Sequence, residues 1–262
     1  MKAAILSWLP QNFPWEENIC WFDTIDSTND ALKVMARQGA PHGTVVLSDH
    51  QTGGHGRRGR SFHSPAGSGV YMSVLLRPEC KATELMHLTC AAAVAMCDAV
   101  QAAAGFRPGI KWTNDLVSGK RKLGGILTEL GFSPQGEVDY AIIGVGINCS
   151  QQETDFPHEI QSIAASLTMV AGQSVDRFQI AAAMMEAFQK MDLAQKERIL
   201  HTYRKDCITI GQNISLVRGD AVRYGTALDV DSDGALIVRF SDGTIEAVNS
   251  GEVSVRGMYG YL

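Results

Sequence analysis

Residues 53–60, which we call the arginine loop, combine the two residue types that a chain needs to hold an anion. The run reads Gly-Gly-His-Gly-Arg-Arg-Gly-Arg, so three arginines stand among four glycines. Glycine lets the backbone take φ > 0 and approach a ligand closely, and each guanidinium offers a fixed fork of N–H donors that matches phosphate or carboxylate oxygens. We therefore predict a site for a small anionic ligand. A flexible, solvated loop is the alternative explanation of such a run.

The same glycines also match a misleading pattern. Gly54, Gly56 and Gly59 have the G-x-G-x-x-G spacing of a dinucleotide-binding turn. That turn must open a helix whose N-terminus faces the pyrophosphate. Here residues 64–69 continue the loop with proline, serine and glycine, and residues 70–76 form an apolar run of strand length. The context therefore argues against a dinucleotide-binding domain.

Two further polar clusters follow, at residues 111–115 (Lys-Trp-Thr-Asn-Asp) and 120–125 (Lys-Arg-Lys-Leu-Gly-Gly). Trp112 offers a flat apolar surface for a ring, Asn114 and Asp115 offer a cation-binding or hydrogen-bonding corner, and Lys122 precedes two glycines that allow close backbone approach. Taken alone, Asn114-Asp115 is typical of a turn and the three cations are typical of a solvated surface. Their occurrence together with the arginine loop favours one shared site.

The elements that must position these clusters are predicted from periodicity and turn chemistry. A polar triplet, residues 27–29, lies on a strand-to-helix turn, because Ser27 and Asp30 resemble a capping box for a helix that ends near Gly39. Further helices are expected over residues 82–104 and through 160–207, and strands over 19–25, 44–48, 69–77, 109–113, 123–130 and 140–148. After Gly211, short strands bounded by glycine and aspartate predict a small β-barrel or meander of about 50 residues. We place a domain boundary near Ile208, which gives domains 1–207 and 208–262.

Composition narrows the class of protein. The 262 residues are 45% hydrophobic and 19% charged, which is ordinary for a soluble globular chain, and the net charge of −5 argues against a general nucleic-acid binder. The six cysteines include no C-x-x-C pair, and the sequence contains no pattern typical of a zinc site. We therefore expect a reducing, cytoplasmic location. The first residues only faintly resemble a signal peptide. No run is expected to approach the roughly 20 apolar residues of a membrane span, so we expect no membrane association.

The order of these motifs resembles the biotin protein ligases, which attach biotin to carboxylase carrier domains. Four segments carry the resemblance, which extends over nearly the whole chain. They are the loop Gly54–Arg60, Lys-Trp-Thr-Asn-Asp at 111–115, Lys-Leu-Gly-Gly-Ile-Leu at 122–127, and Gly-Val-Gly-Ile-Asn at 144–148. The triplet 27–29, Gln51 and residues 251–256 also match the family. The resemblance implies an α+β fold, in which a mixed sheet with flanking helices of the class II synthetase-like biotin/lipoate ligase type precedes a small SH3-like β-barrel.

The family's activity implies roles for particular residues. Biotin and ATP react to biotinyl-adenylate, and a carrier lysine then takes the biotin. The catalytic residues expected from the resemblance are Lys122, Arg57 and Asp115. The residues expected to bind biotin are Ser27, Thr28, Asn29, Gln51, Gly54, His55, Gly56, Arg57, Lys122 and Gly125. The residues expected to bind ATP are Arg57, Arg58, Arg60, Phe62, Lys111, Trp112, Asn114, Asn148, Glu252 and Arg256. No metal ligands are assigned, and Mg²⁺ is expected to arrive with ATP.

Two departures from the family pattern stand out. His55 replaces the first arginine of the family loop, and Thr113 replaces a proline. A largely neutral imidazole cannot replace a guanidinium fork, so His55 bears on ligand retention and loop ordering. Because only about 18 residues precede the first predicted strand, too few for a helix-turn-helix unit, we expect a monofunctional ligase without a DNA partner.

Other functions are also consistent with the sequence. A lipoate or octanoate ligase shares the fold and the carrier-lysine chemistry, and a non-catalytic module could grip RNA or an acidic partner with the arginine loop. A ligase disabled at His55 is a third reading. The expected partners are biotin, ATP and a biotin carboxyl carrier protein of acetyl-CoA carboxylase or a related carboxylase, with a homodimer as a candidate assembly.

Overall fold

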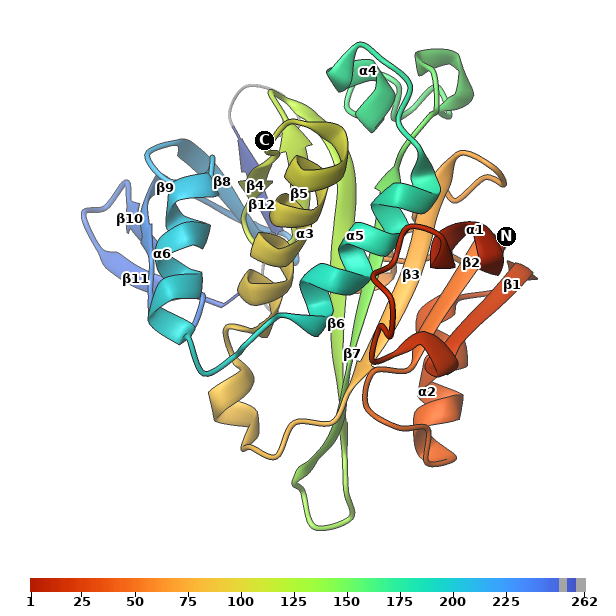
Figure 1. Cartoon of the computed structure of the whole chain (residues 1–262). Coiled ribbons are helices and arrows are strands. Elements are labelled where there is room, and N and C mark those ends of the chain that lie inside the picture. The colour runs from red at the N-terminus through yellow and green to blue at the C-terminus, as the bar shows by residue number, and fades with distance from the viewer. Residues whose placement is uncertain (250–253, 258–262) are drawn as a thin grey trace.

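The structure, a computed structural model, describes residues 1–249 and 254–257. Its centre is a seven-stranded sheet in the order β1-β2-β3-β7-β6-β5-β4 (Figure 1). The strands β1 and β2 are parallel, and every other neighbouring pair in this sheet is antiparallel. The bounds are β1 Ile19–Ile25, β2 Val45–Gln51, β3 Gly69–Leu76, β4 Gly109–Lys111, β5 Asp115–Ser118, β6 Arg121–Phe132 and β7 Val138–Asn148.

Helices cover both faces of this sheet. The α-helices are α1 Lys2–Leu6, α2 Thr28–Arg37, α3 Leu88–Ala104, α4 Leu167–Ala171, α5 Arg177–Gln189 and α6 Lys196–Asp206. Short 3-10 helices are η1 Glu16–Asn18, η2 Arg57–Gly59, η3 Ala82–Leu85 and η4 Glu153–Asp155. Helices α3 and α5 pack together on one face, where they form the main core, and α2 packs on the other face against β2, β3 and β7 (Figure 1).

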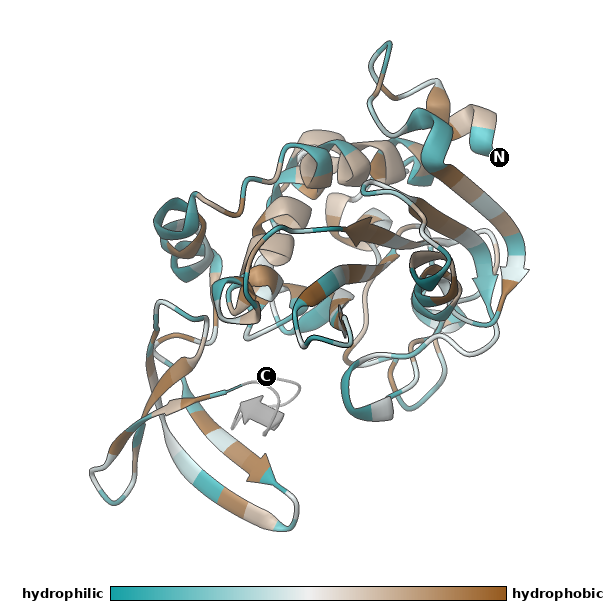
Figure 2. Cartoon of the chain, turned by 90° about the horizontal axis from the view of Figure 1, so that it is seen from below, coloured by the Kyte–Doolittle hydropathy of each residue, from teal (hydrophilic) through white to brown (hydrophobic). Residues whose placement is uncertain are grey.

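Burial on both faces explains the sequence of the central strands. All eight residues of β3 are buried, and β7 is apolar over most of its length. A strand that is covered on both sides reads as a continuous hydrophobic run rather than as an alternating one. Figure 2 shows this as predominantly hydrophobic strands in the middle of the large sheet. On β3, Val74 joins the core under α3 and α5, and Leu75 packs under α2.

Local signals fixed several elements as expected. Ser27 caps α2, since its hydroxyl accepts a hydrogen bond from the backbone N–H of Asp30 at 3.4 Å. Helix α3 ends at Gly105, which adopts the left-handed conformation with φ 78° that glycine tolerates best. The predicted strands 19–25, 69–77 and 140–148 correspond closely to β1, β3 and β7.

Other expectations were wrong in detail. The helix expected over 82–104 is interrupted between η3 and α3, and the helical periodicity of 160–207 belongs to three separate helices, of which α4 ends at Gly172 with φ 67°. Asp115, expected in a turn, begins the short strand β5. The strand expected over 109–113 ends at Lys111, and the Trp112–Thr113 peptide bond is cis.

The expectation that no segment reaches the length of a membrane span was also wrong by length and composition. Residues Ala82–Ala104 form a 23-residue helical stretch of mean hydropathy 1.4 over its most apolar window. Within that window 67% is buried inside the protein, because α3 packs against α5, α6 and the sheet. Its hydrophobicity is therefore explained by the core.

A second, antiparallel sheet follows in the order β11-β10-β9-β8-β12. Its strands are β8 Asn213–Arg218, β9 Ala221–Val230, β10 Leu236–Phe240, β11 Ile245–Val248 and β12 Ser254–Gly257. It lies to one side of the large sheet beside α6 (Figures 1 and 2). Side chains of the large part bind backbone carbonyls of the small sheet: the Trp112 indole donates to the Gly234 carbonyl at 2.9 Å, and the Arg204 guanidinium donates to the Val230 carbonyl at 2.6 Å.

Candidate active site

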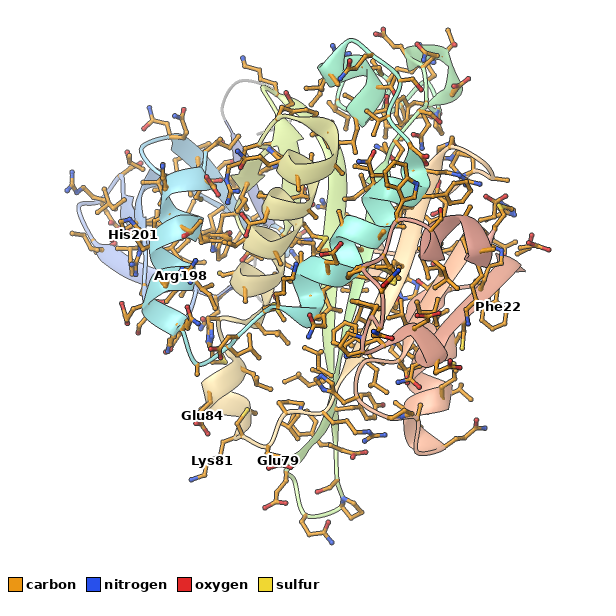
Figure 3. All side chains as sticks on the ribbon, viewed as in Figure 1. Phe22, Glu79, Lys81, Glu84, Arg198 and His201 are labelled. Atoms are coloured by element: carbon orange, nitrogen blue, oxygen red, sulfur yellow. The ribbon has the colours of Figure 1, made fainter. Side chains whose placement is uncertain are left out.

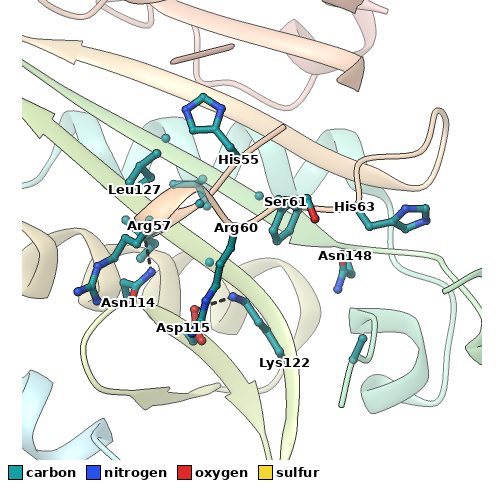
Figure 4. Close-up of a pocket in the computed structure, with 18 of the residues that line it drawn as sticks. His55, Arg57, Arg60, Ser61, His63, Asn114, Asp115, Lys122, Leu127 and Asn148 are labelled. Atoms are coloured by element: carbon teal, nitrogen blue, oxygen red, sulfur yellow. Dashed lines mark hydrogen bonds and ion pairs between the residues drawn. The ribbon is translucent and has the colours of Figure 1, made fainter. Parts of the chain in front are cut away.

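A cavity of about 320 Å³ opens on the α2 side of the large sheet, bordered by the arginine loop and by the ends of β4 to β7 (Figure 4). It brings together residues that are more than 130 positions apart in sequence, from Ser27 to Ala164. The predicted residues that line it are Ser27, Thr28, Asn29, Gln51, His55, Gly56, Arg57, Arg58, Arg60, Phe62, Lys111, Trp112, Asn114, Asp115, Lys122, Gly125 and Asn148.

Alternate residues of β7 form the floor of the cavity. A Cβ on Gly144 would lie 2.0 Å from the Asn29 Oδ1, and a Cβ on Gly146 would lie 2.4 Å from the Phe62 ring. Asn148 is the next residue on this face. Glycine is required at the first two positions because side chains from α2 and from the segment after the arginine loop occupy the space directly above the strand.

At one end of the cavity, residues 27–29 are held by hydrogen bonds to Gln51, the last residue of β2. The Thr28 backbone N–H and hydroxyl both donate to the Gln51 Oε1, at 2.9 and 3.1 Å. The Gln51 amide in turn donates to the Ser64 hydroxyl at 3.2 Å. These bonds fix the start of α2 relative to the segment that follows the arginine loop.

Asn29 is fastened on both sides. Its Oδ1 accepts from the Ser73 hydroxyl at 2.5 Å, and its Nδ2 donates to the Glu129 carboxylate at 2.8 Å. Glu129 also pairs with Lys33 at 2.8 Å. Burial opposes the charge of Lys33, but hydrogen bonds to Glu129 and Asp30 outweigh it and raise the pKa of Lys33 above its usual value. No sequence pattern indicated Glu129, since its contact with α2 depends on the pairing of distant strands.

Lys122 and Asp115 form the ion pair at the centre of the cavity. The ammonium lies 2.7 Å from the Asp115 Oδ1 (Figure 4). The Lys122 backbone bridges to a distant segment, since its N–H donates to the Ile163 carbonyl at 2.7 Å and its carbonyl accepts from the Ala165 N–H at 2.8 Å. A Cβ on Gly125 would lie 3.1 Å from the Lys122 Nζ, so glycine leaves room for the ammonium.

Arg57 is the least exposed of the three arginines in the loop. Its Nη1 donates to the Asn114 Oδ1 at 3.0 Å, and the Asn114 amide donates to the Ile126 carbonyl at 2.8 Å (Figure 4). Burial lowers the pKa of Arg57 below the usual arginine value, although Asp115 acts in the opposite direction. Arg58 and Arg60 are exposed at the rim.

The arginine loop uses its glycines for two reasons. A Cβ on Gly53 would meet the Asp26 carboxylate at 2.1 Å, and one on Gly54 would meet the Ser64 hydroxyl at 2.7 Å, so these two positions require close packing. Gly59 takes φ 70°, and its neighbour Arg58 takes φ 60°. The Nδ1 of His55, one of the two departures from the family pattern, donates to the Gly53 carbonyl at 3.1 Å and lies 4.0 Å from the Asp30 carboxylate.

Three predicted residues are not part of the described cavity. Gly54 packs against Ser64, Gln51 and Phe62 and does not line the cavity. Glu252 lies outside the described residues, and Arg256 is described only as part of the backbone of β12. Lining residues that sequence reasoning missed are Ser61, His63, Ile126, Leu127, Gly144, Val145, Gly146, Phe156, Ile160, Ile163 and Ala164.

The chemistry of this cavity is that of an anion site. Arg57, Arg58, Arg60, Lys111 and Lys122 line it, so five cationic groups surround the cavity. Cations placed in advance stabilise negative charge that develops in a transition state. The arrangement therefore suits a reaction between two anions.

Comparison with known proteins agrees with this chemistry. Residues 21–148 match the Biotin/lipoate A/B protein ligase family, and residues 209–256 match the Biotin protein ligase C terminal domain. The bifunctional ligase/repressor BirA of Bacillus subtilis is 34% identical over 246 residues, which are 91% of this chain and 74% of that protein. The biotin–(acetyl-CoA-carboxylase) ligase of Mycobacterium tuberculosis is 29% identical and covers 87% of this chain and 85% of that protein.

A solved structure supports the same relationship. The biotin protein ligase from Aquifex aeolicus in complex with biotin and ATP superposes with a TM-score of 0.77 at 26% identity. The match covers 92% of this chain and 99% of that one. The mixed sheet with flanking helices and the small C-terminal sheet are those of the ligase fold expected from the sequence. This chain belongs to the biotin protein ligase family.

Proposed function

We propose that this protein is an ATP-dependent biotin protein ligase that forms biotinyl-5′-adenylate and transfers the biotin to a lysine of a carrier domain. The observation that carries the proposal is the meeting of the 27–29 triplet, Lys122 and the arginine loop in one cavity. Relatives named as biotin–(acetyl-CoA-carboxylase) ligases, and the related Aquifex aeolicus structure with biotin and ATP, support it.

The floor of the cavity gives the direction in which the two substrates would lie. From Gly144 to Asn148 the strand rises about 14 Å, at about 3.4 Å per residue. In this proposal the biotin ring system lies at the Asn29 end, where buried polar groups are already fastened. The biotin carboxylate then reaches Lys122, and the nucleotide extends from Phe62 toward Asn148.

The first step joins two anions. A carboxylate oxygen of biotin attacks the α-phosphorus of ATP, the bond from that phosphorus to the bridging oxygen breaks, and pyrophosphate leaves with its Mg²⁺. Lys122 would stabilise the carboxylate and the developing acyl phosphate, with Asp115 orienting its ammonium at 2.7 Å. Arg57 would bind the phosphate from the position where Asn114 holds it. Arg58 and Arg60, at the rim, would complete the phosphate site.

The second step needs no enzyme nucleophile. The neutral amine of the carrier lysine attacks the carbonyl carbon of the mixed anhydride, the amide bond forms, AMP leaves, and the amine loses a proton. Asp115, which lies 2.7 Å from the Lys122 ammonium, would orient the incoming amine. Ser27, Thr28 and Gln51 would keep the biotin ring in place during transfer.

The finer assignments are part of the same proposal. Of the remaining predicted residues, we assign one group to biotin and one to ATP. The biotin group is Asn29, His55, Gly56 and Gly125, and the ATP group is Phe62, Lys111, Trp112, Asn114 and Asn148. We retain Gly54, Glu252 and Arg256 in those sets as sequence-based assignments. We also propose two domains, 1–207 and 208–262, a biotin carboxyl carrier protein as acceptor, and a homodimer. We further propose that the protein has no DNA partner, because its net charge of −5 argues against nucleic-acid binding. All six cysteines are free thiols in the described part of the chain, which supports a cytoplasmic location.

The direct test is transfer of labelled biotin to a purified biotin carboxyl carrier domain in the presence of ATP and Mg²⁺. We expect label on one lysine, and none when that lysine is replaced by arginine. Parallel reactions with lipoate and octanoate test the related ligase activity. Label from either acid at a rate equal to that from biotin would contradict the proposal, as would no transfer at all by folded protein.

A further inference from the structure

We propose that Glu129 is a positioning residue for biotin, which acts through the amide of Asn29 on the hydroxyl of Thr28. In this arrangement the Thr28 oxygen accepts a hydrogen bond from an N–H group of the biotin ring. This inference rests on the proposed function, in which that ring lies at the Asn29 end of the cavity. It adds a residue that lies outside the cavity lining and outside the matching motifs.

Glu129 lies just beyond the cavity, on the same face of β6 as Leu127, which lines it. One carboxylate oxygen, Oε1, lies 2.8 Å from the Lys33 ammonium, and the other accepts from the Asn29 Nδ2 at 2.8 Å. A carboxylate in an ion pair can only accept hydrogen bonds, so it holds the nitrogen side of the Asn29 amide. The Asn29 Oδ1 therefore points the other way, over Gly144.

The amide oxygen of Asn29 meets a buried hydroxyl that has two possible acceptors. Ser73 is fully buried on β3, and its hydroxyl lies 2.5 Å from the Asn29 Oδ1 and 2.8 Å from the Thr28 Oγ1. A hydroxyl has a single proton, and the shorter of these contacts is the one to the amide oxygen. Glu129 thus directs the Ser73 proton to Asn29 and away from Thr28.

The hydroxyl of Thr28 already uses its own proton. It donates to the Gln51 Oε1 at 3.1 Å, and the Thr28 backbone N–H donates to the same oxygen at 2.9 Å, which fixes the orientation of the Gln51 amide. Thr28 lines the cavity, so a ligand meets its oxygen as a hydrogen-bond acceptor. The ureido ring of biotin carries N–H donors and the dithiolane ring of lipoate carries none, so this polarity favours biotin.

Loss of the charge at position 129 would reverse this order. A glutamine side chain can donate as well as accept, so Glu129→Gln leaves the Asn29 amide free to turn. Its nitrogen then faces Ser73, whose proton turns to Thr28 and occupies the lone pair that the biotin N–H needs. Because Asn29, Thr28 and Ser73 are all buried, bulk water does not compensate for the lost acceptor.

The test compares Glu129→Gln with Asn29→Asp and with the double variant that carries both changes. In the double variant the carboxylate at position 29 accepts from Ser73 and from the amide at position 129, which restores the direction of the hydrogen bonds. The matched control is Glu79→Gln, on the exposed surface outside the cavity (Figure 3).

The measurements separate the two substrates. Biotin is titrated calorimetrically into each protein, and ATP is titrated into protein saturated with biotinol, the alcohol analogue that cannot be adenylated. The melting temperature of each free protein is also measured.

We expect the Kd for biotin to rise about 3- to 30-fold in Glu129→Gln, which corresponds to one or two hydrogen bonds. Asn29→Asp should weaken biotin binding at least as much, because two carboxylates then face each other. The double variant should bind biotin at least about 3-fold more tightly than either single variant. The Kd for ATP in all variants, and the Kd for biotin in Glu79→Gln, should stay within about 2-fold of wild type.

An unchanged Kd for biotin in Glu129→Gln would overturn the inference. So would an equal loss of ATP binding, which would indicate a general loss of structure. A double variant that binds biotin no more tightly than the single variants would also overturn it, because the direction of the hydrogen bonds would then not matter.

Two further outcomes are also decisive. If Glu129→Gln does not fold, the comparison of Asn29→Asp with the double variant decides in the same way. Wild-type protein that binds no biotin would contradict both the proposed function and the role of Glu129, whereas wild-type protein that binds biotin and transfers none would contradict the proposed function alone.

Discussion

The substitution Gly144→Ala should separate biotin binding from ATP binding, because the added methyl group meets a single fastened side chain. Its Cβ would lie 2.0 Å from the Asn29 Oδ1, and the three atoms nearest to it all belong to Asn29. Nonbonded heavy atoms are most stable at roughly 3.5–4 Å, so Asn29 must move by more than about 1 Å. That movement breaks its bonds to Ser73 and to the charged Glu129, which together contribute roughly 2–4 kcal/mol.

A loss of this size has a measurable signature. The melting temperature should fall by roughly 4–16 °C, at about 2–4 °C per kcal/mol for a chain of this length. In calorimetric titrations the Kd for biotin should rise about 10- to 100-fold, while that for ATP changes little. The control is a double-mutant cycle with Asn29→Ala, in which Gly144→Ala should add little further destabilisation because the obstructing atoms are gone. Unchanged stability in the single variant, or simple additivity in the cycle, would refute this reasoning.

Three further predictions concern single side chains. Asp115→Asn removes the carboxylate that orients Lys122, so the rate of adenylate formation in rapid-quench experiments should fall about 10-fold or more with little change in the KM for ATP; an unchanged rate would remove Asp115 from the mechanism. His55→Arg restores the family guanidinium opposite Asp30, 4.0 Å from the present imidazole, and should tighten biotin binding about 2- to 5-fold, a gain that Asp30→Asn should abolish. Burial lowers the pKa of His87 below its ordinary value of 6.5. As the pH falls, the imidazole is therefore protonated in the unfolded chain before it is protonated in the folded chain. The free energy of unfolding should therefore decline as the pH falls below about 6.5, and urea titrations at pH 7.5 and 5.5 should show a smaller decline in His87→Gln; an equal decline would exclude His87 as its source.

Features that local chemistry determines could be predicted from the sequence. The cap at Ser27, the stop at Gly105 and the apolar runs that became β3 and β7 depend on neighbouring residues, and the structure confirms them. The gathering of the arginine loop, residues 111–115 and Lys122 in one cavity was expected because the motifs resemble one family. The catalytic and binding roles of these residues stay predictions.

Features that depend on distant parts of the chain were missed. His63 and Glu129 carry no local motif, and their positions follow from loop packing and from the pairing of β6 with β7. The strand β5 is only four residues long and begins at Asp115. Because Asn114-Asp115 is typical of a turn, the sequence pattern predicted a turn at the start of this strand. Gly54, which the family resemblance assigns to biotin, also packs closely against Ser64, a contact that no sequence pattern indicated; its role toward biotin stays a prediction.

The most direct test of the central claim is biotin-dependent exchange of labelled pyrophosphate into ATP. Wild-type protein is compared with Lys122→Ala and with Lys120→Ala, an exposed lysine two residues earlier that serves as the matched control. We predict exchange that requires biotin, is not supported by lipoate, falls by orders of magnitude in Lys122→Ala and persists in Lys120→Ala. No exchange by folded wild-type protein with Mg²⁺ present, or full exchange by Lys122→Ala, would contradict it.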